Sequence, residues 1–489
     1  MSTMSDPERH SAVEPRLPRG FRDLLPELMM ARNWIIDTVR RVYESYGFVP
    51  LQTPAIEHLD VLFDSAGEEA QHQTFTAHNP DKEPLGLRFD LTVPLARVVA
   101  QYPELPRPFR RYQVAPVWRF DKPAKGRYRE FTQFDIDSVG VDSEVADAEI
   151  IACICDALKA LGLGRYLVRF SSRALLNLLL DFAAIPQERG VEVFRVLDKL
   201  DKIGIENVLK ELTTGHVFSG DTIKGLGLRQ SQVERIEQFV AIRANRRDDV
   251  ILQLRQLFAH VHGATEEIDV VENISTVLRK MRKGDDEVAI DLSIARGLAY
   301  YTGPVFEAIL LDAPQFGSIF GGGRYDNLVT RFLGERIPAT GASLGVDRLL
   351  DAMEYLNRVS SRRATARVLV ANMDHALTLD YVGFARELRA AGIPTELYLG
   401  SERSVGRQLK YADQCGLPLV VLFGSNEKES GTVTIKDMSV GRKSAKQTAE
   451  RVEWLAARSG QHVIPRDQLV PAIGRLLAAI DGSDPARGC

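Results

Sequence analysis

Two runs of alternating apolar and polar residues, RYQVAPVWRFD at 111–121 and YREFTQFDIDSVG at 128–140, constrain the fold most strongly. Alternation with a period of two is typical of β-strands that bury one face. Only the short basic segment KPAKGR separates the two runs. A connection this short joins antiparallel neighbours, because parallel strands need a crossover of a dozen or more residues. The sequence therefore predicts an antiparallel hairpin with a basic tip.

Apolar periodicity and breaker residues divide the rest of the chain into segments. We expect an α+β domain built on an antiparallel sheet and interrupted by a helical insertion. An alternating strand–helix pattern predicts a C-terminal α/β domain with a largely parallel sheet. The expected segments are a disordered N-terminus 1–16, the two halves of the α+β domain 17–172 and 286–356, the helical insertion 173–285, a Ser- and Arg-rich linker 357–366, and the α/β domain 367–489.

Composition excludes several classes of protein. With 62 basic and 66 acidic residues among 489, the net charge of -4 does not indicate a nucleic-acid partner. A local basic face on such a protein could still bind nucleic acid. No apolar run is long enough to span a bilayer, and the polar N-terminus lacks the apolar core of a signal peptide. Four cysteines in so long a chain fit a reducing compartment. We therefore expect a cytoplasmic protein without membrane contact.

Two residue pairs raise the question of a metal. Cys153 and Cys155 are too few and too close for a four-ligand zinc site, and small apolar positions on a helix explain them better. His260 and His262 have Glu266 as the nearest third ligand, but Gly263 is expected to end the helix before it. The sequence predicts no metal site built from protein side chains.

Arginine stands beside glycine at the expected edges of strands in three separate places: Arg119 with Arg127 and Arg129, Arg296, and Arg348. One such arginine is best explained by a surface ion pair. Arginines that converge on one sheet from three places are better explained by a bound polyanion, because guanidinium binds phosphate bidentately and stacks on flat rings. The chain contains no GxxxxGK[ST] loop, so a nucleotide would be bound without a P-loop.

Acids and amides accompany these arginines. Gln133, Asp135 and Asp137 fall on one strand face, because side chains repeat every two residues along a strand. Such a face can bind the ammonium group and polar side chain of an amino acid, and an exposed sheet face explains it about equally well. Other candidates are Asp90 and Thr92 in RFDLT and Glu307 in PVFE.

Several motifs resemble those of one enzyme family. VWRF…GRYREFTQFDID is similar to motif 2 of the class II aminoacyl-tRNA synthetases, GASLGVDRLL at 341–350 to motif 3, and TPAIE at 53–57 to the end of motif 1. DLSIARGLAYYTGPVFE resembles the histidine-specific segment of the histidyl-tRNA synthetase family, and GGGRYDNLV and PRGFRDLLP are similar to two further segments of that family. The resemblance extends from about residue 17 through the C-terminal domain.

The resemblance implies that the chain joins histidine to ATP and then transfers the histidyl group to tRNA(His). It implies that Arg119 holds the α-phosphate of ATP, that Arg127 reaches the outer phosphates, and that Arg348 stacks on adenine opposite Phe131. Arg296 would bridge the histidine carboxylate and the α-phosphate, so Arg296 and Arg119 are the expected catalytic residues. ATP is expected as a substrate, accompanied by Mg²⁺.

The same resemblance implies the remaining contacts. The α-ammonium of L-histidine would meet Asp90, Thr92 and Gln133, and the imidazole would meet Asp137 and Tyr301, beside Tyr300. Transfer RNA would contact Lys122 and Lys125 in the basic tip and, in an anticodon-binding domain, Arg403, Arg407 and Lys410. The family also implies a homodimer. The chain departs from the usual family pattern at Ala124 and Ala299.

Two other readings share part of this pattern. The synthetase-like regulatory subunit of ATP phosphoribosyltransferase resembles the catalytic core but lacks the C-terminal domain and usually the ARGLxYYTG segment, both of which are present here. Synthetase-like domains of stress kinases bind uncharged tRNA without catalysis, and this chain has no kinase motif. Histidine-dependent exchange of pyrophosphate into ATP separates the enzyme from both.

Overall fold

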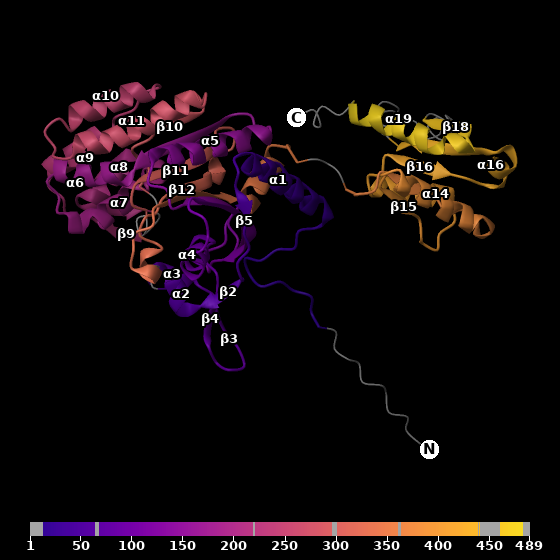
Figure 1. The fold of residues 1–489 in the computed structure, drawn as a ribbon, viewed down its shortest axis with the longest axis horizontal. Helices are drawn as coiled ribbons and strands as arrows, with labels where there is room; N and C mark the ends of the chain where they lie inside the picture. Colours follow the sequence, from indigo (N-terminus) through magenta and orange to yellow (C-terminus); the bar gives the residue numbers. More distant parts are fainter. Residues whose placement is uncertain are drawn as a thin grey trace, which may run out of the picture. The chain divides into compact units, whose positions relative to one another are not determined.

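A computed structural model describes residues 13–63, 68–218, 221–295, 301–359, 363–438, 440 and 460–482. The chain divides into two compact units (Figure 1). The first comprises Met1–Asp23 and Trp34–Arg358, and the second comprises Leu24–Asn33 and Val359–Cys489. Each unit has its own sheet and its own hydrophobic core.

An eight-stranded sheet forms the centre of the first unit. Its six inner strands are antiparallel, and a short parallel strand closes each edge. This confirms the antiparallel α+β fold, with parallel pairing at the edges that was not predicted. In spatial order the strands are β1 (Val49–Pro50), β5 (Phe109–Trp118), β6 (Glu130–Val139), β13 (Ala339–Gly345), β12 (Ser318–Arg324), β11 (Pro304–Leu310), β7 (Tyr166–Ser172) and β10 (Val288–Ile290).

The predicted hairpin is strands β5 and β6. Their register pairs Arg111 with Asp137 and Gln113 with Asp135, so these four side chains lie on the same face of the sheet. On the opposite face Phe134 and Ile136 are fully buried, and Tyr43 packs edge-on against the Phe134 ring. The hairpin therefore has one apolar face in the core and one polar face.

Helices cover the apolar face of the sheet. Helix α5 contacts five of the inner strands, and α11 packs against α5. Ser143 caps α5 by accepting a hydrogen bond from the amide of Val145. The helices of this layer and of the sheet's margins are α1 (Pro26–Ser45), α2 (Leu59–Phe63), α3 (Glu68–Gln73), α4 (Thr92–Gln101), α5 (Glu144–Ala160), α12 (Thr330–Leu333) and α13 (Val346–Tyr355).

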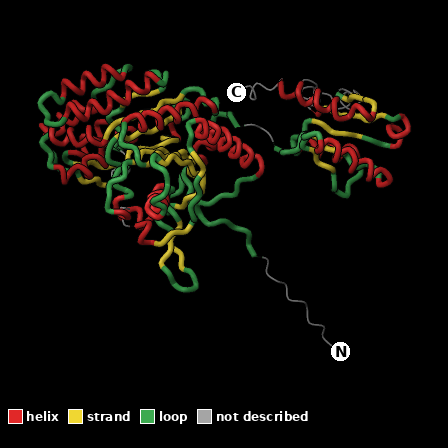
Figure 2. Tube along the Cα trace, in the orientation of Figure 1, coloured by secondary structure: helices red, strands yellow, loops and turns green. Residues whose placement is uncertain are grey.

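The proline-rich run FVPLQTPAIE at 48–57 is divided between two sheets. It forms β1 and, in a separate three-stranded sheet, β2 (Ile56–His58), which pairs with β4 (Pro84–Leu87) beside β3 (Thr76–His78). Pro50 and Pro54 have no amide hydrogen to donate, which prevents continuous ladder pairing along this run. Strands β3 and β4 form a hairpin that projects from the first unit (Figures 1 and 2).

The segment 173–285 is mostly helical and lies at one end of the first unit (Figure 2). It also contains a two-stranded hairpin that the helical periodicity did not predict. His260 and His262 lie in the connection between α10 and α11. The expectation that Gly263 ends a helix is wrong, because Gly263, with a φ of 76°, directly precedes α11, which contains Glu266. The elements are α6 (Arg173–Phe182), α7 (Gly190–Leu197), α8 (Leu200–Leu212), β8 (Gly215–Phe218), β9 (Asp221–Lys224), α9 (Gln230–Val240), α10 (Arg247–Leu257) and α11 (Ala264–Lys280).

The second unit has a mixed five-stranded sheet in the order β15-β14-β16-β17-β18. The expectation of a largely parallel sheet is wrong, because two of its four strand pairings are antiparallel. Its elements are β14 (Val368–Val370), α14 (Thr378–Ala390), β15 (Thr395–Leu397), α15 (Val405–Gln414), β16 (Leu419–Leu422), α16 (Ser425–Ser430), β17 (Thr432–Asp437), β18 (Gln461–Pro465) and α19 (Leu469–Gly482).

Candidate active site

The polar face of the large sheet carries a pocket. Strand register aligns polar side chains across five neighbouring strands, while glycines in the middle leave space above the sheet. The pocket has a volume of about 360 Å³. One aligned row consists of Glu307, Gly321, Ser343, Asp135 and Gln113, and the next of Val305, Gly323, Gly341, Asp137 and Arg111.

Three of the predicted arginines meet at this pocket. Arg119 follows β5, Arg127 belongs to the loop between β5 and β6, and Arg348 lies on α13, and all three line the pocket. The fourth, Arg129, does not line it. Its guanidinium instead lies 3.7 Å from the centre of the Phe120 ring and donates to the carbonyl of Arg19 at 3.2 Å. The expectation for Arg129 was therefore wrong, because it points toward the N-terminal loop.

Arg119 is held in place without a carboxylate partner among the described contacts. Its Nε donates to the carbonyl of Phe89 at 3.0 Å, and its guanidinium lies 4.3 Å from the Phe89 ring and 5.2 Å from the Phe131 ring. Nη2 is 3.5 Å from Oε1 of Gln133. Aromatic contact orients the guanidinium without neutralising its charge. Arg119 therefore presents a positive charge to the pocket.

The loop between β5 and β6 folds back over the pocket. The backbones of Ala124 and Arg127 exchange two hydrogen bonds, and the carbonyl of Gly126 accepts from Nε of Arg348 at 3.4 Å. Nζ of Lys125 lies 5.3 Å from the ring centre of Phe316 and 5.0 Å from that of Tyr355. Lys125 is exposed but lies over these rings, and Lys122 is exposed.

Sequence reasoning missed Arg22, which comes from the segment PRGFRDLLP. Its Nη1 donates to Tyr128 at 2.7 Å and to Asp351 at 2.8 Å, and its Nη2 donates to Asp347 at 3.0 Å. The other oxygen of Asp347 accepts from the amide of Thr132 at 2.6 Å. Arg22 therefore joins α13, which carries Arg348, to the strand that carries Gln133. The segment PRGFRDLLP was noted for its resemblance to the family, but the local sequence does not reveal this role of Arg22, since its partners lie more than 100 residues away.

Asp137 lies buried in the second polar row and is not among the residues that line the pocket. Nη2 of Arg111 is 2.8 Å from its Oδ2, and the hydroxyl of Tyr325 donates to its Oδ1. A Cβ on Gly341 would lie 2.0 Å from the same Oδ1, so only glycine fits there. Arg111 and Tyr325 were missed by sequence reasoning. Arg111 was identifiable in principle, because the hairpin register places it opposite Asp137.

Burial raises the pKa of both carboxyls in this cluster, while Arg111 counteracts the effect. Burial raises the pKa of Asp135 to about 7, with Arg111 lowering it and Asp137 raising it further. The pKa of Asp137 is also raised by burial, and Arg111 and Tyr325 lower it. Two carboxyls beside one guanidinium therefore favour one proton held between them near neutral pH.

Replacing Asp135 with asparagine is expected to change how stability depends on pH. Between its ordinary pKa of 3.8 and about 7, folded Asp135 holds a proton that the unfolded chain has lost. The free energy of unfolding of the wild type should therefore fall as pH rises through this window, by at most about 1.4 kcal/mol per pH unit. Asp135→Asn should flatten this fall in urea unfolding measured from pH 5 to pH 8. Parallel curves for the two proteins would contradict the assignment.

The predicted histidine contacts occupy different positions. Gln133 and Tyr301 line the pocket, and Gln133 also donates to Ser343 at 2.5 Å. Asp90 is not among the lining residues, and it accepts from the amides of Thr92 and Val93 at 3.1 and 2.9 Å at the start of α4. Arg296 and Tyr300 lie outside the described residues. Ile294 and Tyr301, which flank them, both line the pocket.

In the second unit, Arg407 and Lys410 lie exposed on α15, whereas Arg403 precedes the helix. Nη1 of Arg403 donates to the carbonyl of Asn372 at 3.2 Å, and Arg407 forms an ion pair with Glu402 at 2.5 Å. Arg407 and Lys410 are therefore exposed on the helix, while Arg403 is partly buried just before its start.

Within the described ranges no three His, Cys, Asp or Glu side chains come close enough to hold a metal ion. The carboxylates nearest the pocket are instead bound to protein donors, as in the 2.8 Å pair between Asp121 and Arg127. Among the helices that the structure describes, none has both the length and the apolar character needed to cross a membrane.

Comparisons with known proteins agree with the motifs. Residues 20–349 match the family model of histidyl-tRNA synthetase, and residues 366–458 match that of an anticodon binding domain. A histidine–tRNA ligase from Cereibacter sphaeroides is 41% identical over 484 residues, which cover 94% of this chain and 97% of that protein.

Solved structures of similar fold include a histidyl-tRNA synthetase. The histidyl-tRNA synthetase of a Nostoc species has a TM-score of 0.79 at 30% identity, covering 95% of this chain and all of that one. A structure from Bacillus halodurans described as an ATP phosphoribosyltransferase regulatory subunit/histidyl-tRNA synthetase has a TM-score of 0.67 over 82% of this chain and 97% of that one. At 23% identity this second likeness concerns the fold alone.

Proposed function

The chain belongs to the histidyl-tRNA synthetase family and joins L-histidine to tRNA(His) at the expense of ATP, and we propose that the pocket on the large sheet is where histidine and ATP react. The observation that carries this assignment is the meeting of Arg119, Arg127 and Arg348 at one pocket of about 360 Å³. Three guanidiniums suit a triphosphate better than any neutral ligand.

The proposed first step is attack of the histidine carboxylate on the α-phosphorus of ATP, which releases pyrophosphate and forms histidyl-adenylate. Two anions must approach each other, so the site must supply positive charge and alignment rather than a protein nucleophile. Arg119 would bind the α-phosphate, and Arg127 the outer phosphates. Adenine would lie between Phe131 and Arg348, and Arg296 would bridge the carboxylate and the α-phosphate.

Histidine would lie over the two polar rows. Its ammonium would meet Gln133, with Asp90 and Thr92 contributing from the start of α4. Its imidazole would be bound by Asp137 and Tyr301, beside Tyr300, with Tyr325 orienting Asp137 through the hydroxyl bond described above. A buried acceptor and a buried donor reject amino acids that cannot pair with them, because an unpaired buried polar group is costly.

Magnesium fits this site only as part of the substrate. Because the carboxylates nearest the pocket bind arginine or tyrosine, the described residues offer no cage of oxygen ligands for a divalent cation. We propose that Mg²⁺ enters bound to the phosphates of ATP, as is usual for this ion.

Transfer RNA would contact residues of each unit. We propose that Lys122 and Lys125 contact its acceptor end through phosphates, which position the RNA without reading its sequence. Lys125 would first have to leave the rings of Phe316 and Tyr355. Arg403, Arg407 and Lys410 would contact the anticodon stem-loop. A cytoplasmic location follows from the use of charged tRNA by ribosomes.

We further propose a homodimer formed around the margin of the large sheet. Val49 on the edge strand β1 is 50% exposed, Ile56 44% and Tyr102 44%. Beside them lies a groove of about 580 Å³ lined by Leu51, Tyr102 and Phe109 among others. An edge strand with exposed apolar side chains is a site for pairing with a second chain.

Val49→Asp is expected to convert the dimer to a monomer, because a charge would be buried without a partner at the interface. Sedimentation equilibrium should give twice 54.5 kDa for the wild type and 54.5 kDa for the variant. A wild type that sediments as a monomer at micromolar concentration would contradict the proposal. Leu252→Asp, at a 56% exposed position in the helical insertion, is the control and should remain dimeric.

Histidine-dependent exchange of radiolabelled pyrophosphate into ATP tests the proposed chemistry directly. Exchange should require histidine and magnesium but not tRNA, and charging of tRNA(His) should follow with the same enzyme. Exchange without charging would leave tRNA recognition unsupported. Absence of exchange from the folded protein would favour a regulatory or tRNA-sensing protein over an enzyme.

A further inference from the structure

The backbone of residues 301–303, within the histidine-specific segment, is hydrogen-bonded to the end of β12 and to the start of α6. The amide of Thr302 donates to the carbonyl of Arg324 at 2.8 Å, and the amide of Asp326 donates to Oγ1 of Thr302 at 3.2 Å. The carbonyl of Gly303 accepts from the amide of Arg173 at 2.8 Å. The position of Tyr301 therefore depends on where Arg324 and Asp326 lie.

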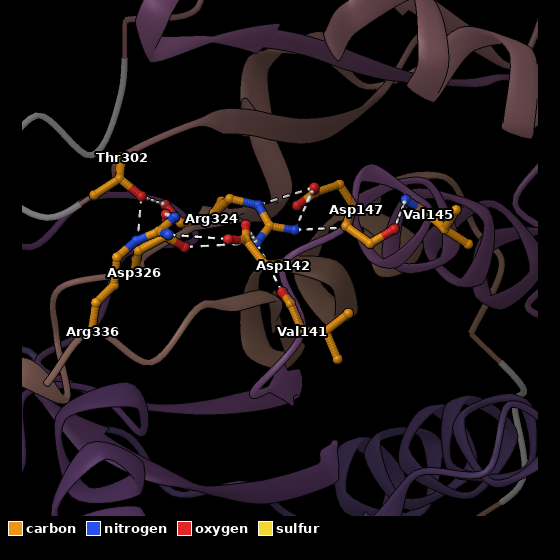
Figure 3. Close-up of polar contacts among 9 residues, drawn as sticks. Val141, Asp142, Val145, Asp147, Thr302, Arg324, Asp326 and Arg336 are labelled. Carbon is orange, nitrogen blue, oxygen red and sulfur yellow. Dashed lines mark hydrogen bonds and ion pairs between the residues drawn. The ribbon is translucent and has the colours of Figure 1, made fainter. Parts of the chain in front are cut away.

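Side chains alternate along β12, so Arg324 points to the face opposite that of Gly323, toward α5. Figure 3 shows its guanidinium beside Asp147. Its Nε and Nη2 donate to Oδ2 of Asp147 at 3.1 and 2.7 Å. Its Nη1 donates to the carbonyl of Val141 at 3.0 Å, and its Nη2 donates to that of Ser143 at 2.9 Å. Arg324 is 7% exposed and Asp147 is fully buried, so these bonds are made with almost no water present.

Arg336 forms two further ion pairs beside the Thr302 contact. Nη2 of Arg336 donates to Asp326 at 2.6 Å, and its Nη1 donates to Asp142 at 3.0 Å (Figure 3). Asp326 also lies 3.6 Å from Nη1 of Arg324. Both residues that contact Thr302 are thus held in place, Arg324 by Asp147 and Asp326 by Arg336.

Gly323 and Tyr325, the two neighbours of Arg324 in the chain, each lie against a residue that we propose binds histidine. A Cβ on Gly323 would lie 2.9 Å from Cδ1 of the Tyr301 ring, so glycine lets that ring lie on the strand. Tyr325 donates to Asp137. Between them, only Arg324 points to the opposite face, because side chains alternate along a strand.

We propose that Arg324 is a positioning residue: its guanidinium, bound to Asp147, fixes Thr302 and thereby holds Tyr301 in the pocket, where by the proposed function Tyr301 meets the imidazole of histidine. This inference rests on the proposed function, and it adds a support on the far side of the sheet to the residues that would touch histidine. Displacement of a recognising side chain by about 1 Å can cost on the order of 100-fold in rate.

Kinetics with histidine and ATP varied separately distinguish this role from simple stabilisation. Arg324→Met keeps the aliphatic stem beside Gly303 and removes the fork of donors. We expect kcat/KM for histidine in pyrophosphate exchange to fall about 10- to 100-fold, with KM for ATP unchanged. Arg324→Lys, which keeps the charge opposite Asp147, should recover part of this loss.

Two further variants keep the test decisive. Thr302→Val removes only the hydroxyl that accepts from Asp326, and it should raise KM for histidine about 5-fold even if Arg324→Met fails to fold. Lys199→Met deprives the buried Glu211 of its 2.6 Å partner in the helical insertion and should leave both KM values unchanged.

Two results would overturn the inference. One is a folded Arg324→Met or Thr302→Val with unchanged kinetics for histidine, and the other is an equal rise in KM for ATP. Absence of exchange in the wild type would instead refute the proposed function, so the two failures are distinguishable.

Discussion

Replacing Arg119 with alanine is expected to lower kcat for histidine-dependent pyrophosphate exchange by about 10²- to 10³-fold, the usual cost of removing one preorganised donor to a developing charge. Among the described contacts Arg119 has no carboxylate partner, and aromatic rings at 4.3 and 5.2 Å orient its guanidinium. Its full charge is thus available to the α-phosphate that we propose it binds. The loss should appear mainly in kcat, because charge accumulates in the transition state.

Arg129 provides the matched control for this experiment. It belongs to the same hairpin and also lies against an aromatic ring, Phe120, at 3.7 Å, but it points away from the pocket. Arg129→Ala should therefore retain exchange within a few-fold of the wild type. Equal losses in the two variants would show that general charge or folding of the hairpin, rather than contact with ATP, explains the effect.

The contrast between Arg119 and Arg129 also shows what the sequence can and cannot predict. Both are strand-edge arginines near glycine, and the local pattern treats them alike. The pattern did predict the β5–β6 hairpin, because its alternation is uninterrupted and its connection is short. It did not predict which way a side chain points once the strand has ended, since the period of two no longer applies there.

Long-range pairing explains most of the other differences. The antiparallel half of the second unit's sheet depends on β17 and β18, whose pairing no local signal specifies. Arg22 contacts side chains of α13, 325 and 329 residues away along the chain. Periodicity identifies elements and faces, and motifs identify candidate residues, but the partners that hold those residues follow from tertiary packing.

Arg111 is the missed residue with the greatest expected consequence. It is fully buried on the polar face, 2.8 Å from Oδ2 of Asp137, and also donates to the carbonyl of Leu91 at 3.1 Å. It lowers the pKa of Asp137, which burial raises. Without Arg111, the buried pair Asp135 and Asp137 would lose the charge that lowers both pKa values, and protonation of Asp137 would increase.

Arg111→Met is therefore expected to raise KM for histidine at pH 7 by about 10- to 100-fold, the worth of a hydrogen bond to a charged group. A protonated Asp137 no longer accepts the imidazole N–H as a carboxylate. Because the ionised form of Asp137 is the one that binds imidazole in this proposal, KM of the variant for histidine should fall as pH rises from 7 to 9. KM for ATP should stay at its wild-type value.

Arg110→Met is the control for this prediction, because Arg110 is the next residue on β5 but points to the opposite face, where it pairs with Glu149 at 2.7 Å. It should leave KM for histidine and its pH dependence unchanged. A pH-independent rise in KM for Arg111→Met would mean that Arg111 acts by packing alone. Recovery at alkaline pH in Arg111→Met only would instead establish that the buried guanidinium matters because it favours the ionised form of Asp137.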